Sequence, residues 1–309
     1  MIKNKPPLLS VCLITYNHAP YITKAIEGVL MQKVNFNWEF IIADDCSNDG
    51  TKEIVTEYAH KFPSLIIPIL QRKNVGPGIN WMQLMNRPRS KYIAYFEGDD
   101  YWTDPLKLQK QVDWMETNPD YSICYHRVWE KRGNTLEEEK MNIEFEDKTY
   151  ELIDLAKGNI MHTPSVLFRN HFKDGVPEWF LGCSIGDYPL HIFNAQYGKI
   201  RYLPDLMAVY RIHDKGMFST LNQNQKFVKI IDTLSKILSY LDLPKDVIRI
   251  LQNRKNNLIH FLLNGLWKEK SLVNFISIWF KYAKQNPDGS LLWLRTRIIG
   301  FFRGRKVGG

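Results

Sequence analysis

Cysteine is scarce in this sequence and is never closely paired. The four cysteines lie far apart, with no C-x-x-C pair: Cys12, Cys46, Cys124 and Cys183. A disulfide-dense scaffold and a zinc finger both need closely spaced cysteines, so this spacing argues against either class. We therefore expect free, mostly buried thiols in a reducing compartment.

Long hydrophobic runs are also missing. No stretch reaches the roughly 18 uncharged apolar residues that a membrane-spanning helix requires. The first seven residues carry Lys3 and Lys5 and no apolar segment of the kind found in a signal peptide. These absences predict a cytoplasmic protein that at most lies on a membrane surface.

Glycine-rich phosphate loops are absent as well. The first apolar run, residues 8–14, is followed by Thr15-Tyr16-Asn17 rather than by G-x-G-x-x-G or G-x-x-x-x-G-K-[ST]. These motifs mark dinucleotide-binding Rossmann units and P-loop enzymes, so neither class is favoured. If the chain binds a nucleotide diphosphate, its charge must be neutralised in another way, for which a divalent cation is suited.

The residues that are present predict an α/β fold. Hydrophobic residues make up 44% of the chain and charged residues 24%, as is typical of a globular protein. Apolar runs at 8–14, 40–43, 65–70 and 91–96 alternate with helical patterns at 20–32, 49–61 and 78–87. Repeated strand–helix units favour a Rossmann-like, mostly parallel sheet flanked by helices, with a ligand crevice along the strand ends. Pro68 indicates that the third strand lies at an edge.

Charge divides the chain into two parts. Residues 221–309 carry 16 Lys and Arg but only 5 Asp and Glu, a net charge of +11, whereas residues 1–220 have a net charge of −3. The basic part has helical patterns at 227–241, 244–266 and 271–284. We therefore predict a domain at 1–220 and a helical region at 221–309.

Acidic side chains gather where the fourth predicted strand ends. Glu97, Asp99 and Asp100 directly follow the run 91–96. Carboxylates this close repel one another unless a cation or hydrogen-bond donors compensate, and Mg²⁺ or Mn²⁺ prefers such oxygen ligands. The alternative is a solvated acidic turn. Polar residues also end the first two strands, at Thr15 and Asp44, and this convergence favours a metal–nucleotide site.

Three motifs in this order resemble the inverting family-2 glycosyltransferases of the GT-A fold, of the bacterial polysaccharide type. They are Val11–Asn17, Ala43–Thr51 and Glu97–Trp102, within a resemblance that spans about 8–220. The family's D-x-D motif falls on Glu97-Gly98-Asp99, with glutamate in the first position. The resemblance implies Mn²⁺ or Mg²⁺ at Asp99 and Asp100. It also implies nucleotide-sugar contacts by Thr15, Tyr16, Asn17, Asp44, Asp45, Glu97, Asp99 and Asp100.

Two later segments extend the resemblance. Gly182–Leu190 resembles the segment that carries the family's catalytic base, which makes Asp187 the candidate, although a helix N-cap is an alternative role. The segment after 206–209 resembles a loop that closes over the donor. There His213 is the further candidate metal ligand, and Arg211 and Lys215 are candidates for phosphate contact. A solvated loop histidine is the alternative for His213.

The acceptor side is assigned to Trp102, His162 and Ser165. The segment Met161–Arg169 resembles the family's acceptor-lining stretch, although the capped start of a strand explains His162 and Ser165 equally well. The charged stretch 130–148 is interpreted as a solvated, mobile loop. An insertion that faces the acceptor is the alternative interpretation.

The resulting hypothesis is an inverting, metal-dependent glycosyltransferase that moves a sugar, most simply from a UDP-sugar, to a saccharide acceptor. Residues 290–306 combine Trp, Leu, Ile and Phe with five basic residues and no acidic one, which is typical of a helix lying on an anionic membrane. We therefore expect peripheral attachment to the inner face of the membrane, a lipid-linked acceptor and no nucleic-acid partner. A catalytically inactive glycan- or nucleotide-binding scaffold at the membrane is the alternative; a glycosidase is disfavoured.

Overall fold

The computed structural model describes residues 6–141, 146–172, 174–214, 216, 218–268, 276 and 279. The chain divides into two compact units, Met1–Ser219 and Thr220–Gly309. Within the described residues, no helix combines the length and the apolar character needed to cross a bilayer. All four cysteines are free thiols; Cys12 and Cys124 are buried, and Cys46 and Cys183 are partly exposed.

The first unit is built on a ten-stranded mixed sheet, with strand order β3-β2-β1-β4-β9-β6-β10-β5. Its first four strands are parallel and run β1 Leu9–Thr15, β2 Trp38–Asp44, β3 Ile66–Leu70 and β4 Tyr92–Glu97. They confirm the α/β fold predicted from the apolar runs. Pro68, which has no N–H to donate, lies in β3 at the end of this order, as predicted.

The other half of the sheet mixes strand directions. Short strand β9, Leu167–Arg169, is antiparallel to both β4 and β6. Strands β6, Tyr121–Arg132, and β10, Lys199–Ile212, run parallel to each other. Two register shifts between Leu203 and Ala208 interrupt this pairing, after which β10 also pairs with β5, Tyr101–Trp102. β10 therefore brings residues after 208 to the loop that follows β4.

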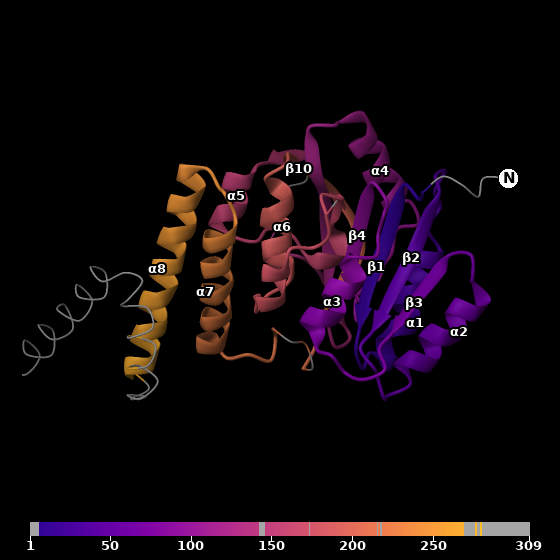
Figure 1. Ribbon diagram of the computed structural model, residues 1–309, viewed down its shortest axis with the longest axis horizontal. Helices are drawn as coiled ribbons and strands as arrows, with labels where there is room; N and C mark the ends of the chain where they lie inside the picture. The colour runs from indigo at the N-terminus through magenta and orange to yellow at the C-terminus, as the bar shows by residue number, and fades with distance from the viewer. Residues whose placement is uncertain are drawn as a thin grey trace, which may run out of the picture. The chain divides into compact units, whose positions relative to one another are not determined.

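Helices cover both faces of the sheet, which Figure 1 shows nearly edge-on. Helices α1 (Ala19–Leu30), α2 (Thr51–Lys61) and α4 (Lys107–Thr117) lie on one face. They bury Ile26, Val55 and Val112 in one core with Val11 and Leu13 of β1. Alternate residues of a strand point to opposite faces, so Cys12 points to the other face, where α3 (Pro77–Met85) and α6 (Asp187–Ala195) lie.

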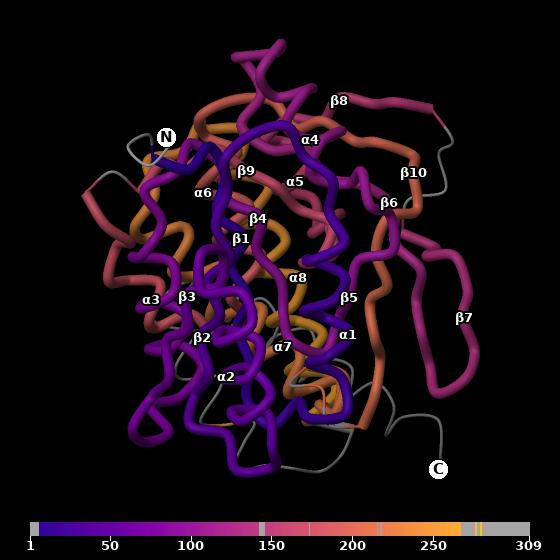
Figure 2. The backbone as a smooth tube through the Cα atoms, turned by 90° about the vertical axis from the view of Figure 1, so that its right-hand side faces the viewer, coloured from indigo at the N-terminus to yellow at the C-terminus, as the bar shows by residue number. Residues whose placement is uncertain are grey.

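Part of the charged stretch 130–148 is paired as strands rather than forming a loop, which corrects the prediction for those residues. β6 continues to Arg132 and turns at Gly133, whose φ is +56°, into β7, Thr135–Glu138. Figure 2 shows this hairpin projecting from the sheet. β8, Lys148–Tyr150, then pairs with β10. All four β7 side chains are exposed, so this strand is solvated as expected but is paired as a ribbon.

Three short helical elements follow β8 along the first unit. They are α5 Leu152–Lys157, the 3-10 turn η1 Thr163–Ser165 and the 3-10 turn η2 Glu178–Gly182. Tyr188 of α6 donates a hydrogen bond to the carbonyl of Leu155 at 2.7 Å, so α5 and α6 are joined.

The second unit contains helices α7, Gln223–Tyr240, and α8, Lys245–Lys268. Asn222 caps α7 by accepting a hydrogen bond from the backbone N–H of Gln225, whose side chain accepts from the N–H of Asn222. Ile231, Leu262, Leu263 and Leu266 form the buried contact between the two helices. The predicted helix at 271–284 and the basic segment 290–306 lie outside the described residues, apart from positions 276 and 279.

Candidate active site

The ends of the parallel strands bring the predicted polar residues to one edge of the sheet. Thr15 of β1 is level with Asp44 of β2, and Ile14 is level with Glu97 of β4. The three strand ends therefore lie side by side, as the open-sheet prediction requires.

Two of the strand-end residues fix the loops around them. The backbone N–H of Asn17 donates to Ser47 Oγ at 2.9 Å, and Asn17 Oδ1 accepts from the N–H of Asn48 at 3.0 Å. Asn17 adopts a positive φ of 53°, which asparagine tolerates better than most residues. The fully buried Asp44 accepts hydrogen bonds from the N–H and the hydroxyl of Ser47. The loops after β1 and β2 are therefore tied together.

Asp45 holds a third loop in the same way. Its two carboxylate oxygens accept from the backbone N–H groups of Val75 at 2.7 Å and Gly76 at 2.9 Å. Thr15 is buried, with its hydroxyl 3.2 Å from His18 Nδ1. Of the residues assigned to nucleoside contact, Tyr16 offers the open surface, since it is 45% exposed.

Gly98 permits the acidic loop to approach these groups closely. A Cβ at this position would lie 2.7 Å from Thr15 Oγ1 and 3.0 Å from His18 Nδ1. Real Cβ atoms do not sit this close to another heavy atom, so any side chain would push the loop away from β1.

The acidic cluster itself is compact and incompletely satisfied. Glu97, Asp99 and Asp100 each offer one carboxylate oxygen within 4.8 Å of the others. Asp99 Oδ1 and Asp100 Oδ2 are buried and have no hydrogen-bond partner among the described residues. Buried carboxylate oxygens normally have donors or a cation, so this set fits a divalent ion with oxygen ligands.

The pKa values of the three acids diverge because of their surroundings. Burial, followed by the charges of Asp99 and Asp187, raises the pKa of Glu97 to about 8. Burial and the charge of Asp99 also raise the pKa of Asp100. Burial acts in the same direction on Asp99, but a hydrogen bond with His213 and the charge of His18 hold its pKa below the usual value. The ionised form is therefore favoured most at Asp99, and a cation would relieve the repulsion among the three acids.

The end of β10 attaches directly to the acidic loop. The backbone N–H of Arg211 donates to Asp100 Oδ1 at 2.8 Å, and its guanidinium donates to the carbonyl of Asp99. His213 Nε2 lies 3.0 Å from Asp99 Oδ2. His213 is thus beside the acid assigned to the metal, with its side chain only 16% exposed, and its role as a metal ligand stays a prediction. Lys215 lies outside the described residues.

Aromatic side chains that the sequence reasoning did not assign support Arg211 and His213. The Arg211 guanidinium lies 4.4 Å from the ring centroid of Tyr101 and 5.0 Å from that of Tyr21. The Tyr21 ring also lies 5.1 Å from the His213 ring. Tyr21 lies in the first turn of α1, directly after the first motif, but no local pattern there indicates a partner near residue 211.

Asp187 is the first residue of α6, and its N-cap position is occupied by Gly186. Asp187 is therefore not the N-cap residue of α6, which was its alternative role. Asp187 Oδ2 accepts a hydrogen bond from Asn159 Nδ2 at 2.9 Å. Its charge contributes to the raised pKa of Glu97, so the candidate base lies beside the acidic cluster.

The structure corrects two of the three acceptor-side assignments. Trp102 is 2% exposed; its Nε1 donates to the carbonyl of Pro164 at 2.9 Å, and its ring packs 4.8 Å from that of Phe96. Ser165 is fully buried and donates its hydroxyl to the carbonyl of His162 at 2.7 Å. Both belong to the core because β5 is a strand of the sheet and η1 packs against β4, β6 and β10, so neither lines an open surface.

His162 remains near the site but has protein partners. Its Nε2 lies 3.3 Å from Glu139 Oε2, and its ring centroid lies 4.7 Å from that of Tyr210. Glu139 is 2% exposed and accepts a hydrogen bond from the N–H of Val128 at 3.0 Å. The sequence reasoning placed Glu139 in a solvated loop, because a run of three glutamates gives no sign that the last one is buried.

Comparison with known proteins matches more than half of the chain to a family. The description "Glycosyl transferase family 2" matches residues 10–175. An uncharacterized protein of Mycobacterium tuberculosis, Rv1520, is 37% identical over 225 residues, which cover 71% of this chain and 63% of that protein. The chain thus spans less than two thirds of that relative. The putative teichuronic acid biosynthesis glycosyltransferase TuaG of Bacillus subtilis is 33% identical over 43% of this chain and 52% of its own length.

Solved structures share the fold. Staphylococcus aureus TarS, residues 1–349, in complex with UDP-GlcNAc has a TM-score of 0.59 and 19% identity, over 84% of this chain and 72% of TarS. The mannosyltransferase PcManGT of Pyrobaculum calidifontis, in complex with GDP-Man and Mn²⁺, has a TM-score of 0.59 and 16% identity, over 96% of this chain and 81% of that one. The profile match over more than half of the chain, together with the strand-end geometry, shows that this chain belongs to glycosyl transferase family 2.

Proposed function

We propose that the chain transfers a sugar from a nucleotide-sugar to a hydroxyl group of a saccharide acceptor, with inversion at the anomeric carbon. The observation that carries this proposal is the acidic cluster, in which two oxygens are buried without partners among the described residues, beside the separately held carboxylate of Asp187. A cation site for a diphosphate and a carboxylate for an acceptor proton are the two parts that such a transfer requires.

The donor is a nucleoside diphosphate sugar, and a UDP-sugar is our first candidate. The structure of TarS with UDP-GlcNAc and that of PcManGT with GDP-Man and Mn²⁺ support this class of donor. Tyr16 offers an exposed ring beside the strand ends for the nucleoside. Arg211 supplies positive charge next to the acidic loop for the phosphates.

Asp99 and Asp100 would hold Mn²⁺ or Mg²⁺, with Glu97 and His213 beside them. When bound, the ion neutralises charge on the departing nucleoside diphosphate. The aromatic contacts of Tyr21 and Tyr101 keep the end of β10 against this loop.

Asp187 acts as the general base. The acceptor oxygen attacks the anomeric carbon while the bond from that carbon to the diphosphate oxygen breaks, and the electron pair leaves with the nucleoside diphosphate. The acceptor proton passes to the Asp187 carboxylate. Because this is a single displacement from the opposite face, the anomeric configuration inverts.

The acceptor that we propose is a lipid-linked saccharide of a cell-surface polysaccharide. TuaG, a putative teichuronic acid glycosyltransferase, supports the polysaccharide class. The basic, aromatic composition of 290–306 supports peripheral attachment to an anionic membrane. Flotation of the full chain and of a chain lacking 290–309 with anionic vesicles tests the attachment; equal flotation would remove this part of the proposal.

The activity is tested by incubating the protein with a panel of nucleotide-sugars in Mn²⁺, Mg²⁺ or EDTA and measuring the released nucleoside diphosphate. We expect turnover of one donor class that requires metal and is lost in Asp187→Asn, with donor binding retained. Asp113→Asn, which removes an exposed carboxylate on α4, is the matched control. Absence of both turnover and metal-dependent nucleotide binding would instead favour an inactive scaffold.

A further inference from the structure

The two oxygens of the Asp187 carboxylate have different surroundings. Oδ2 accepts a hydrogen bond from Asn159 Nδ2 at 2.9 Å. Oδ1 has no hydrogen-bond partner among the residues that the structure describes. One oxygen is therefore held in place, and the other is available to receive a proton.

The orientation of the Asn159 amide follows from its neighbours. A carboxylate only accepts hydrogen bonds, so the side of the amide that faces Asp187 must be the Nδ2 donor. The opposite side, Oδ1, faces the backbone N–H of Met161 at 3.3 Å and the ring of His191 at 3.2 Å. If the amide were reversed, its oxygen would face the carboxylate and its N–H groups would face the Met161 donor.

The same geometry fixes the proton on His191. Because Asn159 Oδ1 only accepts, Nδ1 of His191 must carry the hydrogen. His191 is 2% exposed, and burial lowers its pKa to about 4, so the ring is neutral near pH 7. It lies four residues after Asp187 on α6, which places both side chains on one side of the helix.

We infer that Asn159 and His191 are positioning residues for the catalytic base: His191 holds the Asn159 amide, and the amide holds the Asp187 carboxylate toward the acceptor. The inference rests on the proposed function, since it assigns a role to Asp187. Neither residue touches the reacting atoms. Their effect is on the orientation of one carboxylate, and small misplacements of a catalytic group are costly in rate.

Kinetic variants test this chain of contacts. Asn159→Leu keeps the side-chain size and removes the donor, so we expect kcat to fall about 30-fold, with donor KM within twofold of the wild type. His191→Leu should lower kcat about 10-fold. His191→Asn should stay within about threefold, because an asparagine Nδ2 takes the place of the imidazole Nδ1 donor. His60→Leu, at an exposed position on α2, is the matched control.

A double-mutant cycle separates positioning from independent structural roles. If His191 acts through Asn159, the variant with both leucines should be no slower than Asn159→Leu alone. All rates are measured below the melting temperature of each variant. Additive losses, or a His191→Leu variant within twofold of the wild type, would overturn the inference.

The His191 tautomer gives a readout that does not depend on activity. In protein with ¹⁵N-labelled histidine, we expect the His191 signal to show the Nδ1–H tautomer at pH 7, and Asn159→Leu to change it. His191→Asn identifies the signal by removing it. An Nε2–H tautomer in the wild type would contradict the inferred contact.

The outcomes also distinguish this inference from the proposed function. An Asp187→Asn variant that turns over like the wild type would overturn the base assignment, and the positioning role with it. An inactive Asp187→Asn variant, with Asn159→Leu and His191→Leu both within twofold of the wild type, would overturn the positioning role alone.

Discussion

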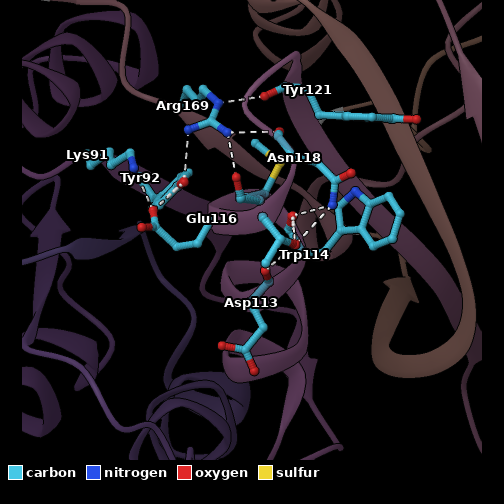
Figure 3. Close-up of polar contacts among 10 residues, drawn as sticks. Lys91, Tyr92, Asp113, Trp114, Glu116, Asn118, Tyr121 and Arg169 are labelled. Carbon is cyan, nitrogen blue, oxygen red and sulfur yellow. Dashed lines mark hydrogen bonds and ion pairs between the residues drawn. The ribbon is translucent and has the colours of Figure 1, made fainter.

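The charged side chains at the two ends of strand β4 differ in how completely their polar atoms are hydrogen-bonded. At the start, the Arg169 guanidinium donates to the Tyr92 hydroxyl at 2.8 Å and to the carbonyls of Met115, Asn118 and Tyr121 at 2.6, 3.1 and 2.6 Å (Figure 3). At the other end, two carboxylate oxygens of Asp99 and Asp100 are buried without partners among the described residues.

The difference separates a charged group whose hydrogen bonds hold the fold together from carboxylates with buried oxygens that have no such partners among the described residues. The guanidinium of Arg169, a residue of β9, donates four hydrogen bonds. Their acceptors lie in β4, at the end of α4 and at the start of β6. The acids after β4 repel one another, and burial raises the pKa values of Glu97 and Asp100. A protein keeps such a cluster at a cost in stability when a bound group compensates for it.

The largest effect should come from Asp99→Asn. This substitution removes, from the acidic cluster after β4, the carboxylate whose pKa is held below its usual value. We expect kcat to fall about 1,000-fold or more, because the metal and the diphosphate lose their main partner. The free energy of unfolding should change by less than about 1 kcal/mol, because lost repulsion offsets the lost His213 contact. Turnover assays and urea unfolding measure the two quantities; a large loss of stability with little loss of rate would break the comparison.

Arg169→Met should give the opposite result. Removing the guanidinium leaves three partly buried carbonyls and the Tyr92 hydroxyl without this donor, so we expect a loss of about 3 kcal/mol in stability. Below the melting temperature, kcat should stay within about twofold of the wild type. An Arg169→Met variant with the stability of the wild type but a much lower kcat would show that the two ends of β4 are not independent.

Metal addition should stabilise the folded protein only when the acidic cluster is intact. A cation at 100 times its dissociation constant adds about 2.7 kcal/mol to the stability of a protein that binds it in the folded state. We expect Mn²⁺ to raise the melting temperature of the wild type and of Arg169→Met, but not of Asp99→Asn. An equal rise in all three would place the ion elsewhere.

The smallest effect should come from Glu116, an exposed side chain near the start of β4. Glu116 contacts Lys91 at 2.6 Å and the Tyr92 hydroxyl at 2.6 Å; although burial opposes it, these partners lower the pKa of Glu116. Its contribution is therefore present above the unfolded-state pKa, about 4.3, and is lost as pH falls through the lower folded-state value.

Because the Glu116 side chain is 41% exposed, we expect less than about 1 kcal/mol from this pair. Glu116→Gln should be slightly less stable than the wild type at pH 7 and equal to it at the acid end of the range. Unfolding by urea from pH 7 to pH 3 measures the difference. A gap that widens toward acid would contradict this assignment of sign.

Local patterns were enough to predict the parallel half of the sheet. Strands β1 to β4 are continuous apolar runs that end in polar residues, and parallel pairing puts their ends together. The acidic cluster was therefore predictable from the order of residues alone. Strand β9 was not predictable, because a strand of three residues is too short to show an alternating pattern. Its position also depends on partners about 45 and 75 residues away in the chain.

Side-chain roles at the site were less predictable than its location. Trp102 and Ser165 looked like acceptor contacts, but burial against the sheet decides their role, and burial of a single residue depends on distant elements. Asn159 stands in an irregular segment, so no motif marks it. The spacing of Asp187 and His191 by four residues was a usable sign, since it puts both on one face of α6.

The long sequence separation between the acidic loop and the end of β10 has a consequence for biosynthesis. Arg211 and His213 contact the Asp99–Asp100 loop across 111 to 114 residues of chain. Ribosomes add about 5–20 residues per second, so several seconds pass between synthesis of the acids and emergence of their partners. Throughout that interval the nascent chain lacks the contacts that Arg211 and His213 make with the acidic loop. A stalled chain that ends before residue 211 would therefore expose the acidic loop without its β10 partners to the translation machinery and its chaperones.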